Sequence, residues 1–137
     1  MAVPPANDDF AAARTVTGVP YTDIADVTGA TLETGEPVSS CRETAAPSGT
    51  VWYAFTPAAT STVKISRTAG FESILAVYTG GSLTTLTETA CQSSQIQALS
   101  LPVTAGQTYF LQIGTFFDQT GTLQLDITRI RTRPGPP

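Results

Sequence analysis

The sequence predicts an all-β domain, an antiparallel β-sandwich of eight to nine strands with jelly-roll-like connections. Apolar and polar residues alternate in short runs such as 63–66 and 123–128, a pattern typical of half-buried strands. Such runs recur about every 8 to 12 residues with Gly- or Pro-containing turns between them, as in antiparallel sandwiches. The 137 residues suffice for one domain with its own core.

Residues 50–80 predict three consecutive strands around which the rest of the chain is arranged. The first strand ends at Pro57, the second contains Val63 and Ile65, and the third is a nearly continuous apolar run ended by two glycines at 80–81. Trp52 lies on the opposite face of the first strand from Val51, Tyr53 and Phe55. It either fills the core or covers the outer face of its sheet, and we expect it in the core.

The segment before these strands predicts one helix-like turn, two extended segments and a long loop. An acidic cluster at 7–9 leads into the turn at 10–13, and residues 14–19 and 21–28 read as extended segments on either side of Pro20. Residues 29–46 form a loop that carries Glu33, Glu36 and Cys41. A loop longer than about 12 residues in a compact domain is usually functional or pinned down, and Cys41 supplies a pin.

After the central strands, four more are expected, at residues 83–90, 96–103, 108–113 and 123–128. Residues 114–121 between the last two form a loop with Phe116, Phe117 and Asp118. These three could form a ligand-binding surface for a sugar ring or a protein strand. The alternative, which we favour, is a phenylalanine that folds back as a lid over the end of the sandwich.

Composition and charge exclude several classes of function. The net charge of −4 argues against nucleic acid as a partner, because phosphate neutralisation needs a basic patch. Arg129, Arg131 and Arg133 cluster at the exit of the last strand, where solvated charge is favoured over an anion site. No apolar run approaches 18 residues, so no membrane insertion is expected.

The two ends of the chain read as linkers. Residues 1–5 are Pro-rich and do not resemble a signal peptide, and residues 131–137 are rich in Pro and Gly. A single β-sandwich domain is therefore expected over residues 6–130, as a monomeric module of a multidomain protein.

The two cysteines, Cys41 and Cys91, predict a disulfide rather than two free thiols. Two cysteines cannot form a zinc site without histidine, and the chain has none. A disulfide implies an oxidising location, so the domain is expected to be secreted or on the cell surface.

Six motifs in order resemble the bacterial pre-peptidase C-terminal domains. They are PANDDF at 5–10, TGATLETGEP at 28–37, VWYAFT at 51–56, LAVYTG at 75–80, TAGQTY at 104–109 and TGTL at 120–123. The resemblance covers nearly the whole chain between the Pro-rich ends. It implies a non-catalytic β-sandwich attached to secreted bacterial enzymes, especially proteases, or repeated in surface proteins.

Related domains of clostridial collagenases bind collagen, and bind calcium through acidic residues near the N-terminus. Asn7 and Asp8 match the N-terminal Asn-Asp of that pattern. The acidic run that usually precedes the Tyr-x-Phe strand is replaced here by PSGT at 47–50. This departure weakens the implied calcium site.

Catalysis is not expected. Without histidine a Ser–His or Cys–His system is impossible within the chain, and no nucleophile-elbow or phosphate-binding motif is present. The pairs Asp8/Asp9 and Glu33/Glu36 could serve glycoside hydrolysis. Acidic residues in loops are more often solvated or bound to cations.

Calcium is the cofactor that the residues themselves suggest. Ca²⁺ takes six to eight oxygen ligands, and the oxygen-bearing residues outside the strands are Asn7, Asp8, Asp9, Glu33 and Glu36. The two stretches could meet at one end of the sandwich. The favoured alternative is that Asn7 or Asp8 caps the turn at 10–13, with Glu33 and Glu36 on the loop surface.

The expected function is a non-catalytic accessory domain of a secreted bacterial multidomain protein, acting as a structural or targeting module beside a protease or other hydrolase domain. Two alternatives stay open: a dedicated binding module for collagen or polysaccharide, and a repeated adhesin unit. A binding module should expose an aromatic strip or an apolar groove on one sheet face.

Overall fold

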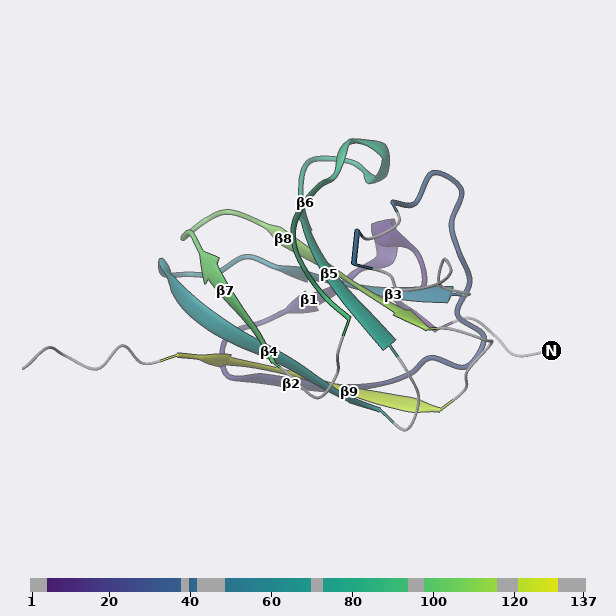
Figure 1. The fold of residues 1–137 in the computed structure, drawn as a ribbon, viewed down its shortest axis with the longest axis horizontal. Helices are drawn as coiled ribbons and strands as arrows, with labels where there is room; N and C mark the ends of the chain where they lie inside the picture. The colour runs from purple at the N-terminus through teal and green to yellow at the C-terminus, as the bar shows by residue number, and fades with distance from the viewer. Residues whose placement is uncertain are drawn as a thin grey trace, which may run out of the picture.

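Nine strands and two short 3-10 turns make up the part of the chain that the computed structural model describes, residues 5–37, 40–41, 49–69, 73–93, 98–115 and 121–130 (Figure 1). In chain order the elements are η1 (Phe10–Ala12), β1 (Arg14–Val16), β2 (Tyr21–Asp26), β3 (Gly49–Phe55), β4 (Ser61–Ala69), β5 (Ser73–Thr79), η2 (Leu83–Thr85), β6 (Thr87–Gln92), β7 (Leu99–Val103), β8 (Tyr109–Thr115) and β9 (Thr122–Arg129). No helix of the described residues is long and apolar enough to cross a membrane.

The strands form a five-stranded sheet in the order β1-β3-β8-β5-β6 and a four-stranded sheet in the order β2-β9-β4-β7. Strands β2 to β9 alone give the orders 3-8-5-6 and 2-9-4-7, which are those of a jelly roll built from two Greek keys. The predicted all-β sandwich and its jelly-roll-like connections are therefore confirmed.

β1 departs from the predicted antiparallel arrangement, because it pairs with β3 in parallel. The chain passes from β1 through the cis Val19–Pro20 bond to β2, which belongs to the other sheet. No hairpin joins β1 to β3, so nothing in the connection forces antiparallel pairing. β1 is thus an edge strand added to the eight-stranded jelly roll.

The main core lies between the two sheets and is built by the alternation that the sequence showed. In β9, Leu123, Leu125 and Ile127 are fully buried, whereas Gln124 and Thr128 are exposed. Its buried members include Val51, Tyr53, Phe55, Val63, Ile65, Leu75, Val77, Leu111, Ile113, Leu123, Leu125 and Ile127.

Two strand boundaries differ from the prediction for local reasons. β2 ends at Asp26, because its carboxylate accepts a hydrogen bond of 2.9 Å from the backbone N–H of Thr28 and so forms a turn. The segment predicted as a strand at 83–90 begins instead as η2, which is closed by a 3.1 Å bond from Thr85 N to Ser82 O. β6 starts only at Thr87.

A second, smaller core lies on the outer face of the five-stranded sheet. Trp52, Ala76 and Tyr78 are buried there, and Phe10 and Phe110 pack against them. The prediction that Trp52 lies in the main core is therefore wrong: it covers the outer face of its sheet. It is nevertheless fully buried, because Phe10 of the N-terminal segment packs against it, with the two ring centroids 5.3 Å apart.

Candidate functional site

The two acidic stretches of the sequence meet on the outer face of the five-stranded sheet, beside the start of β3. Phe10 N donates to Glu33 Oε1 at 3.0 Å, and Thr31 N donates to Asp8 Oδ1 at 2.6 Å, so both contacts join residues far apart in the chain. We call residues 7–12, 31–37 and 40–41 the cover. The two stretches do meet, but over a sheet face and not at one end of the sandwich, as had been suggested.

Asn7 extends the hydrogen bonding of β3 beyond the short strand β1. Its side-chain Nδ2 donates to Trp52 O at 3.0 Å, and its own carbonyl accepts from Trp52 N at 2.9 Å. Asn7 is 1% exposed, and within the described residues its Oδ1 is buried without a hydrogen-bond partner. The residue therefore satisfies the backbone of Trp52 while leaving one oxygen of its own unpaired.

Asp8 is buried and fixes the start of the loop after β2. Its Oδ1 accepts from Thr31 N at 2.6 Å and its Oδ2 accepts from Thr31 Oγ1 at 2.5 Å. The carbonyl of Thr31 in turn accepts from Thr50 N at 3.1 Å, which ties this point to β3. Bonds to a charged acceptor are about twice as strong as neutral ones, so Asp8 is a structural fastening of the cover.

The prediction that Asn7 or Asp8 caps the first turn is wrong. Asp9 holds the N-cap position of η1, is exposed, and makes no capping hydrogen bond with its side chain. The orphan N–H of Phe10 is instead satisfied by Glu33 from the distant loop. Since the carboxylate of Asp8 is occupied by Thr31, the cap has to come from elsewhere.

Glu36 connects the loop to the sheet below it. Its Oε2 accepts from Glu33 N at 2.8 Å, and its Oε1 accepts from Gln112 Nε2 at 2.9 Å and from Thr50 Oγ1. Glu33 and Glu36 are both partly buried. They are therefore part of the packed cover, not plain loop surface as the capping interpretation had it.

Calcium was predicted at Asn7, Asp8, Asp9, Glu33 and Glu36, and their placement can be compared with what Ca²⁺ requires. In the described part of the chain no three His, Cys, Asp or Glu side chains lie together closely enough to hold a metal ion. Three of the four carboxylates accept hydrogen bonds from N–H or O–H donors. Calcium binding at these residues stays a prediction.

The aromatic layer under the cover is held by edge-on and tilted ring contacts. The Phe10 and Trp52 ring centroids are 5.3 Å apart in a T-shaped arrangement, and Phe10 lies 4.6 Å from Phe110. Trp52 and Tyr78 are 6.1 Å apart. These are the distances at which aromatic pairs stabilise beyond their buried area, so η1 is attached to the sheet chiefly through Phe10.

Gln112 links this aromatic layer to the acidic loop. It accepts from Tyr78 Oη at 3.0 Å and donates to Glu36 and, at 2.9 Å, to the carbonyl of Pro37. Burial, with smaller contributions from the negative charges of Glu88 and Glu36, raises the pKa of Tyr78. Tyr78 therefore stays neutral and a hydrogen-bond donor well into the alkaline range.

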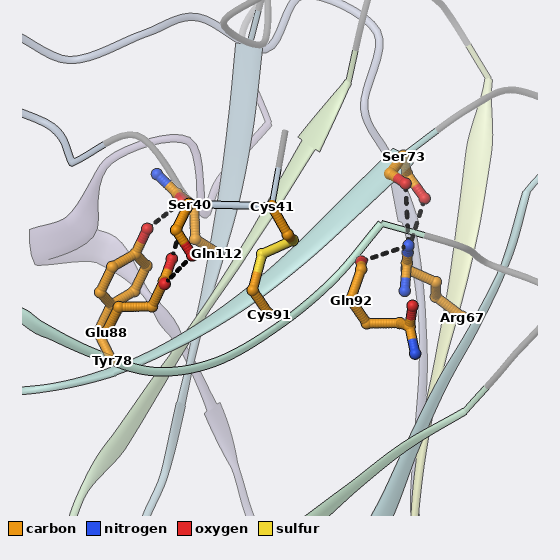
Figure 2. Close-up of a disulfide and its surroundings, with 9 residues drawn as sticks. All are labelled: Ser40, Cys41, Arg67, Ser73, Tyr78, Glu88, Cys91, Gln92 and Gln112. Atoms are coloured by element: carbon orange, nitrogen blue, oxygen red, sulfur yellow. Dashed lines mark hydrogen bonds between the residues drawn. A yellow bond between two sulfur atoms is a disulfide. The ribbon is translucent and has the colours of Figure 1, made fainter. Parts of the chain in front are cut away.

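Figure 2 shows how the last part of the cover is anchored to β6. Cys41 and Cys91 form the predicted disulfide, with their Cα atoms 6.0 Å apart. Beside it, Ser40 N donates to Glu88 Oε1 at 2.8 Å, and Ser40 Oγ donates to Glu88 Oε2. The loop is thus pinned at both ends, by Thr31 near β3 and by Cys41 near β6.

Two polar groups that sequence reasoning did not single out join the sheets to each other. Arg14 of β1 bonds Asp23 of β2 at 2.8 and 3.0 Å, and Tyr53 Oη donates to the same carboxylate at 2.7 Å. Burial and the hydrogen bond to Asp23 raise the pKa of Tyr53. No local motif marks this contact, because its three residues come from three strands.

Arg67 is the second such group. It donates from Nε to Ser73 Oγ at 2.8 Å, and from Nη2 to the carbonyls of Ser73 and Gln92 at 2.9 and 3.0 Å (Figure 2). Burial lowers its pKa to about 10. The signal was present in the sequence, since the alternation of Val63 and Ile65 places residue 67 on the inward face of its strand.

The aromatic loop candidates Phe116, Phe117 and Asp118 lie outside the described residues. Their ligand-binding role stays a prediction.

No protein-family description and no curated protein matches the sequence. A solved structure does match: the pre-peptidase C-terminal domain of collagenase from Bacillus anthracis, with a TM-score of 0.55 and 13% identity, covering 85% of this chain and 94% of that one. At this identity the likeness concerns the fold alone, and it agrees with the resemblance carried by the sequence motifs. The chain has the fold of a pre-peptidase C-terminal domain.

Proposed function

We propose that the chain is a non-catalytic accessory domain of a bacterial multidomain protein that works outside the cytoplasm, beside a protease or other hydrolase domain. The observation that carries this proposal is the use of the candidate site for the fold itself. Asp8, Glu33 and Glu36 bind donors of this same chain, and the disulfide closes the loop that holds two of them. Groups engaged in this way hold structure together.

The disulfide supports the extracytoplasmic part of the proposal. It links residues separated by 50 positions, for which chain-entropy arguments give a stabilisation of about 4 kcal/mol. Such a bond persists in an oxidising compartment and is rare in the cytosol. A domain that depends on it for this much stability is suited to secretion or to the cell surface.

A thiol assay tests this step. Protein produced in an oxidising compartment should show no free thiol in denaturant, and should show two after reduction, with a large loss of stability. Full stability of the reduced protein would contradict the proposal, because the disulfide would then be dispensable.

Calcium binding at Asn7, Asp8, Asp9, Glu33 and Glu36 is a second proposal. The unpaired, buried Oδ1 of Asn7 favours it, because such an oxygen is costly to leave without a partner. The hydrogen bonds of Asp8 and Glu36 oppose it, so binding would require the cover to rearrange. Calorimetric titration of EDTA-treated protein with millimolar Ca²⁺ should then give heat and a thermal shift; neither would appear if these groups only fasten the cover.

The alternative of a polymer-binding module can be examined on the outer face of the four-stranded sheet. The exposed outward side chains of its strands include Thr22, Ile24, Lys64, Gln124 and Thr128, with no aromatic ring among the described residues. A planar polymer surface is usually bound by stacked aromatic side chains. We therefore expect insoluble collagen, cellulose and chitin to leave the protein in the supernatant, whereas retention on any of them would favour the binding module.

A further inference from the structure

One end of the sandwich presents an arginine at a position that normally faces the core. Arg129 pairs directly with Val63 across β9 and β4, and opposite residues in a ladder project to the same side of the sheet. Val63 is buried in the main core, as is Ile127 two residues before Arg129. The alternation therefore turns Arg129 toward the space between the sheets, where the strand ends and the side chain is exposed.

Two cavities adjoin Arg129. The smaller, of about 190 Å³, lies between the turn after β1 and the turn after β3. Most of its lining is apolar, from Val19, Phe55, Pro57, Ala58, Ala59 and Val63, and hydroxyl groups of Thr17, Thr56 and Ser61 also line it. This composition suits an apolar side chain, because burying it there removes its surface from water.

The second cavity, of about 630 Å³, also adjoins Arg129 and lies along the start of β4 and the end of β7. Hydroxyl groups line it, from Thr60, Ser61, Thr62 and Thr104, together with the apolar side chains of Pro102, Val103 and Ile130. Ser61 lines both cavities, so the two cavities share part of their lining. Hydroxyl groups both donate and accept, which suits the N–H and C=O groups of an extended peptide.

Among the described residues that line these cavities, the positive charge of Arg129 has no acidic counterpart. The ion pair found in the described part of the chain is Arg14–Asp23, which does not involve Arg129. Arg129 thus lines both the smaller cavity and the larger one. A planar guanidinium recognises a carboxylate through two parallel hydrogen bonds.

We propose that this end of the sandwich binds the carboxyl terminus of a peptide whose last side chain is apolar. Arg129 donates to the terminal carboxylate, the smaller cavity receives the last side chain, and the larger cavity receives the residues before it. Capture of a free C-terminal carboxylate is a known mode of peptide recognition. An acidic sugar would leave the apolar cavity unused. The site goes beyond the accessory role and does not depend on secretion or calcium.

The test uses an acetylated, dye-labelled tetrapeptide that ends in leucine, with either a free carboxylate or an amide at its C-terminus. Fluorescence anisotropy with the full, oxidised chain should give at least about tenfold tighter binding for the carboxylate. Arg129→Gln should abolish that preference. Lys64→Gln, which removes an equal charge from the outer face of the four-stranded sheet, should keep it. Equal binding of the two peptides, or an unchanged preference in Arg129→Gln, would overturn the proposal.

Two further measurements check that Arg129→Gln stays folded and that the peptide binds at the proposed site. The melting temperature of Arg129→Gln should stay within about 2 °C of the parent, since an exposed residue at a strand end contributes little to stability. Amide NMR shifts on titration with the carboxylate peptide should concentrate at Val19, Val63 and Arg129. Shifts concentrated elsewhere, no saturable binding at millimolar peptide, or tighter binding of a uronic acid trisaccharide would each contradict a peptide C-terminus as the ligand.

Discussion

The outer faces of the two sheets differ in burial and in the side chains that they carry. On the five-stranded sheet, residues 73–78 of β5 are all buried, because the cover and its aromatic layer lie over that face. On the four-stranded sheet, β9 alternates between buried and exposed residues, so one of its faces meets water. The first face is sealed by a disulfide, aromatic rings and carboxylate hydrogen bonds. The second carries hydroxyl, amide and charged groups.

This difference shows which part of the domain adds stability beyond the core between the sheets. A jelly roll needs only the core between its sheets, so the layer outside β3, β5 and β8 is an addition. It uses Asn7, Asp8, Glu33 and Glu36, the polar residues that looked most available for a ligand. Substitutions should therefore lower the free energy of unfolding strongly on the covered outer face of the five-stranded sheet. They should lower it little on the outer face of the four-stranded sheet, which we call the bare face.

Truncating one large side chain on each face should give the largest contrast. Trp52→Ala removes a fully buried indole and leaves a cavity under Phe10, so we expect a loss of about 3–5 kcal/mol in the free energy of unfolding. Ile24→Ala removes an apolar side chain that is 62% exposed on the bare face and should cost at most about 0.5 kcal/mol. Urea denaturation measures both. Similar costs for the two variants would show that the outer layer adds no stability.

Removing the disulfide should be the next largest effect. The double variant Cys41→Ser/Cys91→Ser should lose about 2–4 kcal/mol, because the unfolded chain regains the entropy of an open loop. Reduction of the parent protein should give the same shift in the urea midpoint. If the variant were as stable as the parent, the cover would be held by its hydrogen bonds alone.

The tight approach of the loop to β3 gives a third test. A methyl group added at Gly49 would lie 2.3 Å from the carbonyl oxygen of Ala30, so Gly49→Ala should cost about 1–3 kcal/mol. Gly81, in the turn between β5 and β6, has nothing within 4 Å of such a group, and Gly81→Ala should be close to neutral. Thermal unfolding distinguishes them, and equal melting temperatures would mean that the loop yields easily at Ala30.

The smallest effect concerns alkaline pH. The pKa of Tyr78 is raised above its ordinary value of 10.0, so its contribution to stability is complete below that value and is lost as the pH rises further. Between about pH 9 and pH 11 this contribution should fall by about 1.4 kcal/mol. Tyr78→Phe should show a correspondingly weaker decline of unfolding free energy with pH. An unchanged decline would mean that Tyr78 is open to water in the folded protein.

The fold was predictable because its signals are local. The alternation of Leu123, Leu125 and Ile127 specifies one buried face, and the continuous apolar run at 74–78 suits a strand buried on both faces. Alternation also placed Trp52 opposite Val51. It could not tell that this side is covered, because the covering ring of Phe10 comes from a distant part of the chain.

The candidate site was predictable in its residues but not in its contacts. Because both acidic stretches lie outside the strands, they were expected to be able to meet at one end of the sandwich, whereas they meet over a sheet face. The cap of η1 was assigned to a neighbour, as capping rules suggest, whereas Glu33 reaches Phe10 from another loop. The acceptors of Arg67 are backbone carbonyls of Ser73 and Gln92, which only the packing of the sheets brings near. Side-chain type and spacing carry no information on such contacts.

The most direct test of the account asks whether Glu36 fastens the cover without any metal. Glu36→Gln puts an amide N–H where a donor now points, since Glu36 accepts from Glu33 N on one oxygen and from Gln112 and Thr50 on the other. Asp126→Asn makes the same chemical change on the bare face, where Asp126 accepts from Thr22 Oγ1 at 2.7 Å. Both are compared with the parent by thermal unfolding in EDTA.

We predict that Glu36→Gln costs about 1–3 kcal/mol, a drop in melting temperature of about 4 °C or more, while Asp126→Asn stays within about 2 °C of the parent. If Glu36→Gln matched the parent in EDTA and differed from it only when Ca²⁺ was added, the carboxylate would be a metal ligand and the account of a self-fastened cover would be wrong.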